Sequence, residues 1–316
     1  MSIKTFLSGD EALENRRIDG TGSFKYPQQG DDRVQDGLIF PRITPSFQLE
    51  AGMTAFTIGS CFAREIEAKL TMLKLPTTTL SLPQTVVPGR DNSVINEFNP
   101  GCISQRIRWA VAGQDTREFL DTISLSGDKG KDLLLAKGHT IDVDELLNVR
   151  ALIDNVYAAV PVADILIVTL GMTQTWQDTR TGIYLNRMPS PRDLKREPDR
   201  YVCRFLTVRE TVDLLRDALD RAFDAGTRNA ILTVSPVPLQ QTFQNIDCVI
   251  ANSHSKATLR VAATEIETAF AGRVDYFPSY EIVQSGGLAA FQDDHIHVRR
   301  NVVERITSHM VSHYLA

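Results

Sequence analysis

Strand-length apolar runs alternate with helix-length amphipathic segments along most of this chain. The apolar runs are AFTIGS (55–60), ADILIVTLG (163–171), NAILTVSPVPL (229–239) and VDYFPSYEIV (274–283), and helical periodicity marks residues 61–74, 142–160, 208–226 and 253–272. Within these runs apolar and polar residues do not alternate, which indicates strands buried on both faces. Such strands are typical of parallel sheets whose strands are joined by helical crossovers. We therefore predict an α/β protein, a three-layer α/β/α sandwich around a parallel sheet.

Three regions depart from this alternation. Residues 1–53 are rich in Gly, Asp, Arg and Pro and show little periodicity, which predicts an extended arm that packs on the body or is partly disordered. Residues 84–140 and 176–205 carry proline, glycine and short helical or hairpin-like pieces. Loops that follow parallel strands emerge at the carboxyl edge of the sheet, where such sheets bind ligands. We expect both insertions to wall a pocket in a domain spanning 54–316.

Composition narrows the function classes. The chain of 316 residues is 42% apolar and 23% charged, which is ordinary for a soluble globular protein, and its formal charge of −5 gives no basic footprint for nucleic acid. The N-terminus has no apolar signal core and the longest apolar runs are strand-length, so we expect a cytoplasmic protein without a membrane span. The four cysteines have no CxxC spacing, which predicts reduced thiols. We expect neither a metal nor a cofactor.

The stretch FTIGSCFAREIEAKL (56–70) places Gly59, Ser60 and Cys61 where an apolar strand meets an amphipathic helix. A side chain at that junction lies at the carboxyl edge of the sheet, beside the free N–H groups of a helix end, which suits a nucleophile and an oxyanion. Serine is also a preferred N-cap residue and glycine a common turn residue, so this stretch alone leaves both interpretations open. Cys61 lies roughly 100° further round the helix, and we expect it to serve packing.

An activated serine needs a base within hydrogen-bond reach and a carboxylate that orients the base. The stretch FQDDHIHVRRNVVERI (291–306) concentrates histidines near acids, with Asp294 and His297 just before a final helix. Both can face the strand edge that carries the serine. Alternatively, Asp293 and Asp294 stabilise the start of that helix electrostatically. The pair His295 and His297 also has a metal-ligand spacing, but Asp or His partners elsewhere are lacking.

The segment TIGSCFAREI (57–66) resembles the defining motif of the GSCFA family, a branch similar to the SGNH (GDSL-like) hydrolases. The resemblance covers roughly residues 54–310 and continues in order through FNPGCI (98–103), TLGMTQTW (169–176), LTVSPVPL (232–239), NSHSKATLR (252–260), YFPSYEIV (276–283) and DDHIHV (293–298). It implies a flavodoxin-like sheet whose first strand presents Ser60 as nucleophile. The family's terminal DxxH motif then falls on Asp294 and His297.

The oxyanion hole is where the chain departs from the SGNH pattern. SGNH enzymes use the N–H of the nucleophilic serine, a glycine N–H and the asparagine side chain of a GxND block, whereas the corresponding stretch here is GMTQ (171–174). We predict that Thr173 or Gln174 supplies the side-chain donor in place of asparagine. For the glycine N–H the candidates are Gly101 and Gly89, and we prefer Gly101.

Further side chains are expected to contact substrate. Trp176 could stack on a sugar ring, although a lone tryptophan also suits a core or a rim. Arg64 and His295 are the other predicted substrate contacts. Lys256 and Arg260 are either solvated or face an anionic group.

The resemblance implies a function by analogy. Because the superfamily includes many carbohydrate esterases and acyltransferases, we expect a serine esterase or O-acyltransferase that acts through an acyl-enzyme on a small acyl ester of a carbohydrate-type alcohol. The alternative is a catalytically weakened SGNH-like module that binds a carbohydrate or acyl ligand without turnover. The missing GxND asparagine favours that alternative.

Overall fold

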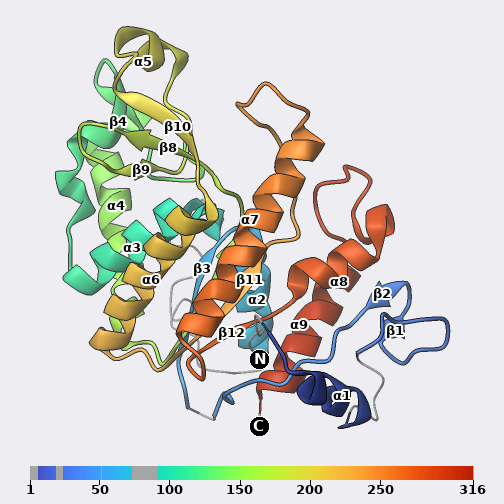
Figure 1. Cartoon of the computed structure of the whole chain (residues 1–316). Coiled ribbons are helices and arrows are strands. Elements are labelled where there is room, and N and C mark those ends of the chain that lie inside the picture. Colours follow the sequence, from blue (N-terminus) through green and yellow to red (C-terminus); the bar gives the residue numbers. More distant parts are fainter. Residues whose placement is uncertain (1–5, 19–23, 51, 73–90, 316) are drawn as a thin grey trace.

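The computed structural model describes residues 6–18, 24–50, 52–72 and 91–315 (Figure 1). Its centre is a four-stranded parallel sheet in the order β12-β11-β7-β3, made of β3 (Ala55–Gly59), β7 (Ile165–Leu170), β11 (Asn229–Val234) and β12 (Val274–Tyr276). The last residue of β3, Gly59, pairs with Thr169, and the last residue of β7, Leu170, pairs with Val234. The three longest strands therefore end side by side at one edge.

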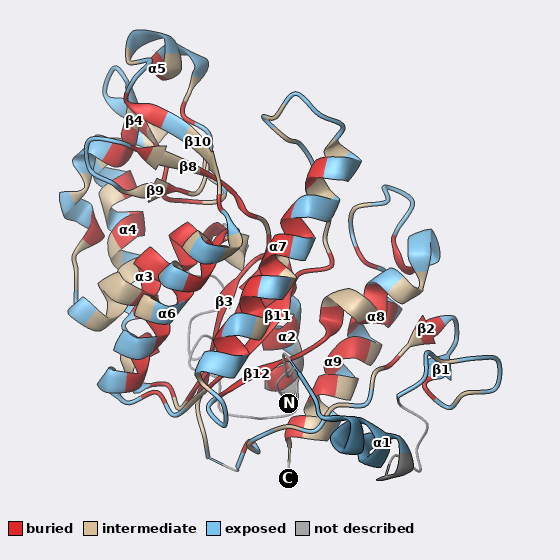
Figure 2. Cartoon of the chain, viewed as in Figure 1, coloured by how far each residue is buried: buried red, intermediate tan, exposed pale blue. Residues whose placement is uncertain are grey.

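Both faces of the sheet are apolar and covered by helices. Within β7, Leu166, Val168 and Leu170 pack into one hydrophobic cluster, whereas Ile165 and Ile167 pack into another, as the two-residue period of a strand requires. The first cluster includes residues of α3 (Pro100–Ala112), α4 (Val143–Tyr157), α6 (Val208–Ala225) and α7 (Cys248–Ala269), and the second includes residues of α2 (Cys61–Met72), α8 (Ser279–Ser285) and α9 (Arg300–Tyr314). Figure 2 shows the buried strands between the two helical layers. The predicted three-layer α/β/α sandwich is confirmed.

Two strands are shorter than their apolar runs. The last strand ends at Tyr276, and α8 begins at Ser279, within the run 274–283. Pro278 has no N–H to donate to a neighbouring strand, so the ladder cannot continue through it. In the same way β11 ends two residues before Pro236. The residues beyond each strand are free to form loops at the carboxyl edge.

The two insertions form small antiparallel sheets to one side of the main sheet (Figure 1). The described part of the first insertion contains η1 (Asn92–Ile95), η2 (Thr116–Glu118), η3 (Leu120–Thr122), β4 (Ile123–Ser126) and β5 (Lys129–Asp132), which pairs with β6 (Ile141–Asp142). The second contains β8 (Gln174–Asp178), β9 (Tyr184–Leu185), α5 (Pro191–Arg196) and β10 (Tyr201–Phe205), with β8 in the middle. The hairpin expected over 176–205 is thus part of a three-stranded sheet.

The N-terminal region contributes to the second hydrophobic cluster. It contains α1 (Gly9–Ile18), β1 (Val34–Gln35) and β2 (Leu38–Ile39). Leu38, Phe40 and Leu49 are buried in the cluster that α9 shares. The Leu49 N–H donates to the Tyr314 carbonyl at 2.6 Å. Residues 38–49 of the predicted arm are therefore in contact with the last helix.

Candidate active site

Ser60 joins β3 to α2. The residue is only 3% exposed, and its Oγ has no hydrogen-bond partner within the described residues. The Ser60 N–H donates to the Thr169 carbonyl of β7 at 3.2 Å, and the Ser60 carbonyl accepts from Ala63 at 2.8 Å. The sheet and the helix thus fix the backbone of the serine, while its hydroxyl makes no N-cap hydrogen bond.

Two glycines allow neighbouring segments to close around the serine. Gly59 has φ +136°, and a Cβ there would lie 2.2 Å from the Thr169 carbonyl oxygen. A Cβ on Gly171 would lie 2.5 Å from the Phe98 carbonyl oxygen and 3.3 Å from the Ser60 Cβ. Real Cβ atoms essentially never approach within 3.0 Å. Any side chain at either glycine would therefore displace a backbone segment next to Ser60.

His297 and Asp294 form a tight turn before α9. The His297 Nδ1 lies 2.5 Å from the Asp294 Oδ2, and the Asp294 Oδ1 accepts the backbone N–H groups of Ile296 and His297 at 2.9 and 3.0 Å. These hydrogen bonds, that of the imidazole first, hold the pKa of Asp294 well below its usual range. Because Nδ1 is engaged by the carboxylate, Nε2 is the ring nitrogen left for a proton transfer.

The turn has a left-handed residue at its centre. His295 has φ +57°, a conformation that is uncommon for residues other than glycine, and its side chain is exposed. Neither acid caps the final helix through a hydrogen bond, because the N-cap position is Arg299 and has no side-chain cap bond; an electrostatic effect of the acids on this helix stays a prediction. Within the described residues, no three His, Cys, Asp or Glu side chains gather where they could hold a metal ion.

Ser60 and His297 line the same pocket, which has a volume of about 370 Å³. Ser60, Gly171 and Ser235, each the first residue after a strand, line it at the carboxyl edge of the sheet. Amide and hydroxyl side chains of the wall come from Ser93, Asn96, Gln174, Ser235, Gln240 and Gln241, and apolar ones from Phe98, Met172, Val237, Pro238 and Leu239. Lys137 also lines it, and the described lining contains no carboxylate.

The predicted oxyanion-hole residues fare differently from one another. Gly101 lies in α3 outside the pocket lining, and a Cβ there would meet the Tyr184 ring at 2.5 Å, so this glycine serves packing. Thr173 is buried outside the lining, and its hydroxyl and N–H both donate to the Ser255 Oγ. Gln174 does line the pocket. Gly89, the other glycine candidate, lies outside the described residues.

The side chain of Gln174 is already engaged. Its Nε2 donates to the Gln241 carbonyl at 3.3 Å, and its Oε1 accepts the Phe243 N–H at 3.0 Å. Gln174 therefore holds the loop 241–243 against β8 and has limited capacity to serve an oxyanion.

The predicted substrate contacts do not reach the pocket lining. Arg64 packs back on β3, where it donates to the Thr57 carbonyl at 2.7 Å and pairs with Glu67. Trp176 makes an edge contact with the Phe243 ring, at 5.2 Å between centroids. His295 is on the exposed turn. None of the three predicted contacts is among the residues that line the pocket.

Asn96 is one of several lining residues that sequence analysis missed, with Ser93, Lys137, Gln240 and Gln241 among the others. It is 1% exposed, its Oδ1 has no hydrogen-bond partner, and no bond to its amide nitrogen is found within the described residues. Its backbone is held firmly, because the Glu97 N–H donates to the Gly59 carbonyl at 2.8 Å and the Asn186 Nδ2 donates to the Asn96 carbonyl at 2.6 Å. A buried amide without a partner beside Ser60 has hydrogen-bonding capacity left for a ligand. Its position, two residues before the FNPGCI segment, is the one signal in the sequence.

Burial affects both the cysteine and the lysine near the serine, and neither side chain is set up to react. Cys61 lines the pocket, and burial raises the pKa of its thiol, so the thiolate is disfavoured. Lys256 is buried in α7, and its Nζ donates to the carbonyls of Gly171, Ser235 and Val237. It is thus neither solvated nor directed at a ligand anion.

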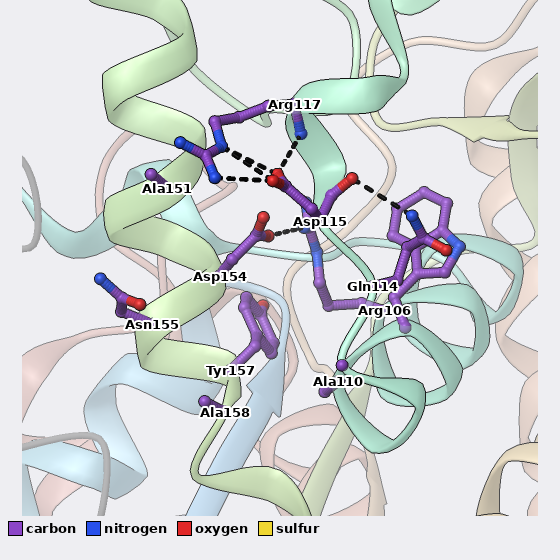
Figure 3. Close-up of a pocket in the computed structure, with 12 residues that line it drawn as sticks. Arg106, Ala110, Gln114, Asp115, Arg117, Ala151, Asp154, Asn155, Tyr157 and Ala158 are labelled. Carbon is purple, nitrogen blue, oxygen red and sulfur yellow. Dashed lines mark hydrogen bonds and ion pairs between the residues drawn. The ribbon is translucent and has the colours of Figure 1, made fainter.

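A second hollow, of about 270 Å³, lies between α3 and α4 (Figure 3). Its lining includes Arg106, which contacts the Asp154 Oδ1 at 3.4 Å and the Glu97 Oε1 at 3.1 Å. Tyr157, which also lines it, donates to the Ile95 carbonyl at 3.0 Å. Through these bonds the residues of the second hollow support the segment that carries Asn96.

The fold and the pocket define a class of protein. It is an α/β/α sandwich in which a buried serine at the carboxyl edge of a parallel sheet shares a pocket with a histidine bonded to an aspartate. The model of the GSCFA family matches residues 54–310, and the chain belongs to the GSCFA family. Comparison with curated proteins found no match. Within the described residues, no helix combines the length and the apolarity needed to cross a membrane.

Proposed function

We propose that this protein is a serine esterase or O-acyltransferase that works through an acyl-enzyme on Ser60. The observation that carries the proposal is that Ser60 and His297 line one pocket while Asp294 binds the Nδ1 of that histidine. This is the arrangement of nucleophile, base and orienting carboxylate that acyl transfer requires. The similarity of the chain to SGNH hydrolases, inferred from its motifs, supports the same roles.

The chemistry follows from these three side chains. The Ser60 Oγ attacks the ester carbonyl carbon, and its proton passes to the Nε2 of His297. The carbon–oxygen bond to the alcohol then breaks, and the imidazolium returns the proton to the leaving oxygen. Attack by water on the acyl-enzyme gives hydrolysis, and attack by a second alcohol gives transfer. Asp294 keeps the imidazole in the required tautomer and stabilises its protonated form.

The negative charge on the carbonyl oxygen needs donors near Ser60. The serine's own N–H already donates to Thr169, so it is less available than the SGNH pattern implies. The Asn96 amide carries two N–H donors beside an Oδ1 that has no partner within the described residues, and the first N–H groups of a helix lack intrahelical acceptors. We assign the side-chain donor to Asn96 rather than to Thr173 or Gln174.

The lining of the pocket supports a hydroxyl-rich alcohol as substrate. The side chains of Asn96, Gln174, Gln240 and Gln241 bring amide groups to the wall, and each amide carries both donors and acceptors that sugar hydroxyls can use. A volume of about 370 Å³ suits a small acyl group and one sugar-sized unit.

The test uses a fluorophosphonate probe and a small ester such as p-nitrophenyl acetate. We expect covalent labelling of the wild-type protein at Ser60, and loss of labelling and turnover in Ser60→Ala and His297→Ala. Cys61→Ala is the matched control, because its side chain lines the same pocket, and it should keep most of the activity. An inactive Cys61→Ala variant with an active Ser60→Ala variant would refute the serine mechanism.

A binding module without turnover is the second candidate. Two observations favour it: within the described residues the Ser60 Oγ has no hydrogen-bond partner, and the Ser60 N–H donates to Thr169. If the wild-type protein shows no labelling and no turnover, while calorimetry detects binding of an O-acetylated sugar that Asn96→Leu abolishes, the module is the correct function.

A further inference from the structure

Lys256 is a buried cation directly behind the pocket wall. It lies in α7 with 1% of its surface exposed. Its Nζ donates to the carbonyl oxygens of Gly171 at 2.6 Å, Ser235 at 2.8 Å and Val237 at 2.7 Å. These three acceptors use all three protons of an ammonium group. While it is protonated, the group has no lone pair with which to serve as a base for Ser60.

This ammonium has no carboxylate partner within the described residues. Burial lowers the pKa of Lys256 to about 7, and the one titratable side chain found to act on it is Cys61 of α2. Burial of a cation without a counter-ion is costly, and a buried lysine is rare for that reason. The cost of burying this charge must therefore be offset by what the ammonium does for its neighbours.

The three acceptors are the residues that form the pocket wall. Gly171 and Ser235 directly follow β7 and β11, and the two strands stop pairing after the Ser235 N–H donates to the Leu170 carbonyl. Beyond that bond the carbonyls of Gly171 and Ser235 have no neighbouring strand to bond, and the Lys256 ammonium donates to them instead. Val237 completes the set, and all three acceptor residues line the pocket.

Helix α7 makes a second contact with the segment that follows β7. Ser255, next to Lys256, accepts the Thr173 N–H at 2.9 Å. On the opposite side, the N–H groups of Gly171 and Met172 donate to the Phe98 carbonyl. The segment 171–173 is therefore fixed between α7 and the segment that carries Asn96, in van der Waals reach of Ser60.

We propose that Lys256 is a positioning residue for the reaction at Ser60. Its ammonium holds the wall of residues 171 and 235–237 in place, and it sets a positive charge behind the Gly171 peptide, near the point where negative charge develops during acylation. The proposal rests on the proposed function, since it needs a reactive serine. A charge in a low-dielectric wall acts on the transition state more strongly than the same charge in water.

The experiment compares wild-type protein with Lys256→Met, which keeps an unbranched side chain one atom shorter and removes the charge and the donors. The rate of fluorophosphonate labelling and the kcat for p-nitrophenyl acetate are measured from pH 5 to 10. We expect Lys256→Met to label about 10²-fold more slowly, the size of effect typical of one preorganised polar group. The wild-type rate should fall again at alkaline pH as the ammonium loses its proton, and the Met variant should lack this alkaline decrease. A side chain with a purely structural role would not alter the shape of the pH profile.

The control is Arg150→Met, which removes a buried cation of α4 that binds Asp132 outside the pocket lining. It should lower thermal stability and leave the labelling rate of folded protein unchanged. If Lys256→Met does not fold, Lys256→Arg takes its place, because arginine stays charged and should abolish the alkaline decrease. The proposal is overturned if folded Lys256→Met labels at the wild-type rate, if the pH profile of the tested variant matches wild type, or if Arg150→Met slows labelling equally. Absence of labelling in the wild-type protein at every pH would overturn the proposed function and this inference with it.

Discussion

Gly171→Ala is the substitution whose effect the structure defines most closely. The added Cβ would lie 2.5 Å from the Phe98 carbonyl oxygen, a backbone atom that cannot rotate away. Since real Cβ atoms essentially never come within 3.0 Å of such an atom, the two segments must separate by at least about 0.5 Å, which is a loss of near-ideal packing. The Ser60 Cβ, at 3.3 Å from the new atom, would also have to adjust.

The separation weakens two backbone hydrogen bonds. The N–H groups of Gly171 and Met172 donate to the Phe98 carbonyl at 3.0 and 2.9 Å, and both bonds would lengthen toward the limit of a hydrogen bond. At about 1 kcal/mol net for each bond, we expect a loss of about 2 kcal/mol in the free energy of unfolding. For a chain of this size that corresponds to a fall of about 3 °C in Tm. A displacement of this order at the nucleophile should lower kcat/KM by about 10- to 100-fold.

The assay pairs thermal unfolding with esterase kinetics on p-nitrophenyl acetate. Gly130→Ala is the matched control, because its Cβ would also meet an atom at 2.5 Å, in this case the Ile123 Cγ2 in the small β4–β5 sheet. That variant should lose stability and keep the kcat/KM of folded protein. If Gly171→Ala has the Tm and the kcat/KM of wild type, the contact between Phe98 and Gly171 does not constrain the serine, and the reasoning fails.

Three further predictions concern the pocket and its support. Asp294→Asn should lower kcat by about 10²- to 10⁴-fold, because it favours the wrong imidazole tautomer. Asp293→Asn changes a fully exposed side chain and should alter kcat little. Equal losses in the two variants would show that the acids are assigned wrongly. In steady-state kinetics Asn96→Leu should lower kcat by about 10²-fold with little change in KM. Gln174→Leu removes the hydrogen bonds to the loop 241–243 and should mainly raise KM. The reverse pattern would identify Gln174, and not Asn96, as the donor to the oxyanion. Burial raises the pKa of Glu97 to about 7, although the charge of Arg106 opposes this shift, so the folded protein keeps a proton that the unfolded chain releases. Wild-type stability should therefore fall as the pH rises from about 4.5 to 7, and urea unfolding of Glu97→Gln should lack this decrease.

The fold was largely accessible from the sequence because its signals are local. A parallel strand buried on both faces is mostly apolar along its whole length, and residues 165–170 and 229–234 show this pattern in the sequence. The ends of the strands are less accessible, since an apolar residue such as Phe277 serves a strand and the start of a helix equally well. Proline was the usable signal there, because Pro278 cannot donate to a ladder.

The site was accessible only where a residue stands at the end of an element. Ser60 follows a strand and His297 precedes a helix at the same sheet edge, so the order of elements brings them to one pocket. The assignments of Gly101 and Thr173 to the oxyanion hole depended on tertiary contacts, which the hydrophobic periodicity of a helix or strand does not specify. Gly101 is a glycine because Tyr184 lies against it, and Thr173 is turned to α7 by Ser255. Both partners are more than 80 residues away along the chain.

Ser60 and His297 differ in how firmly the fold holds them, and this bears on when the site can act. Ser60 is 3% exposed and fixed by sheet and helix, whereas the His297 side chain is 57% exposed and is placed by a turn that the bridge between Phe291 and Val298 closes. Among the residues that the structure describes, the Ser60 Oγ has no partner, so the two side chains are not hydrogen-bonded to each other in the free protein. A ligand that fills the pocket would exclude water from the imidazole and strengthen its attraction to the serine hydroxyl, as catalytic hydrogen bonds often tighten only with substrate bound. Reactivity should therefore rise with the fit of the acyl and alcohol groups, and small unspecific esters should give only a fraction of the rate of the natural ester.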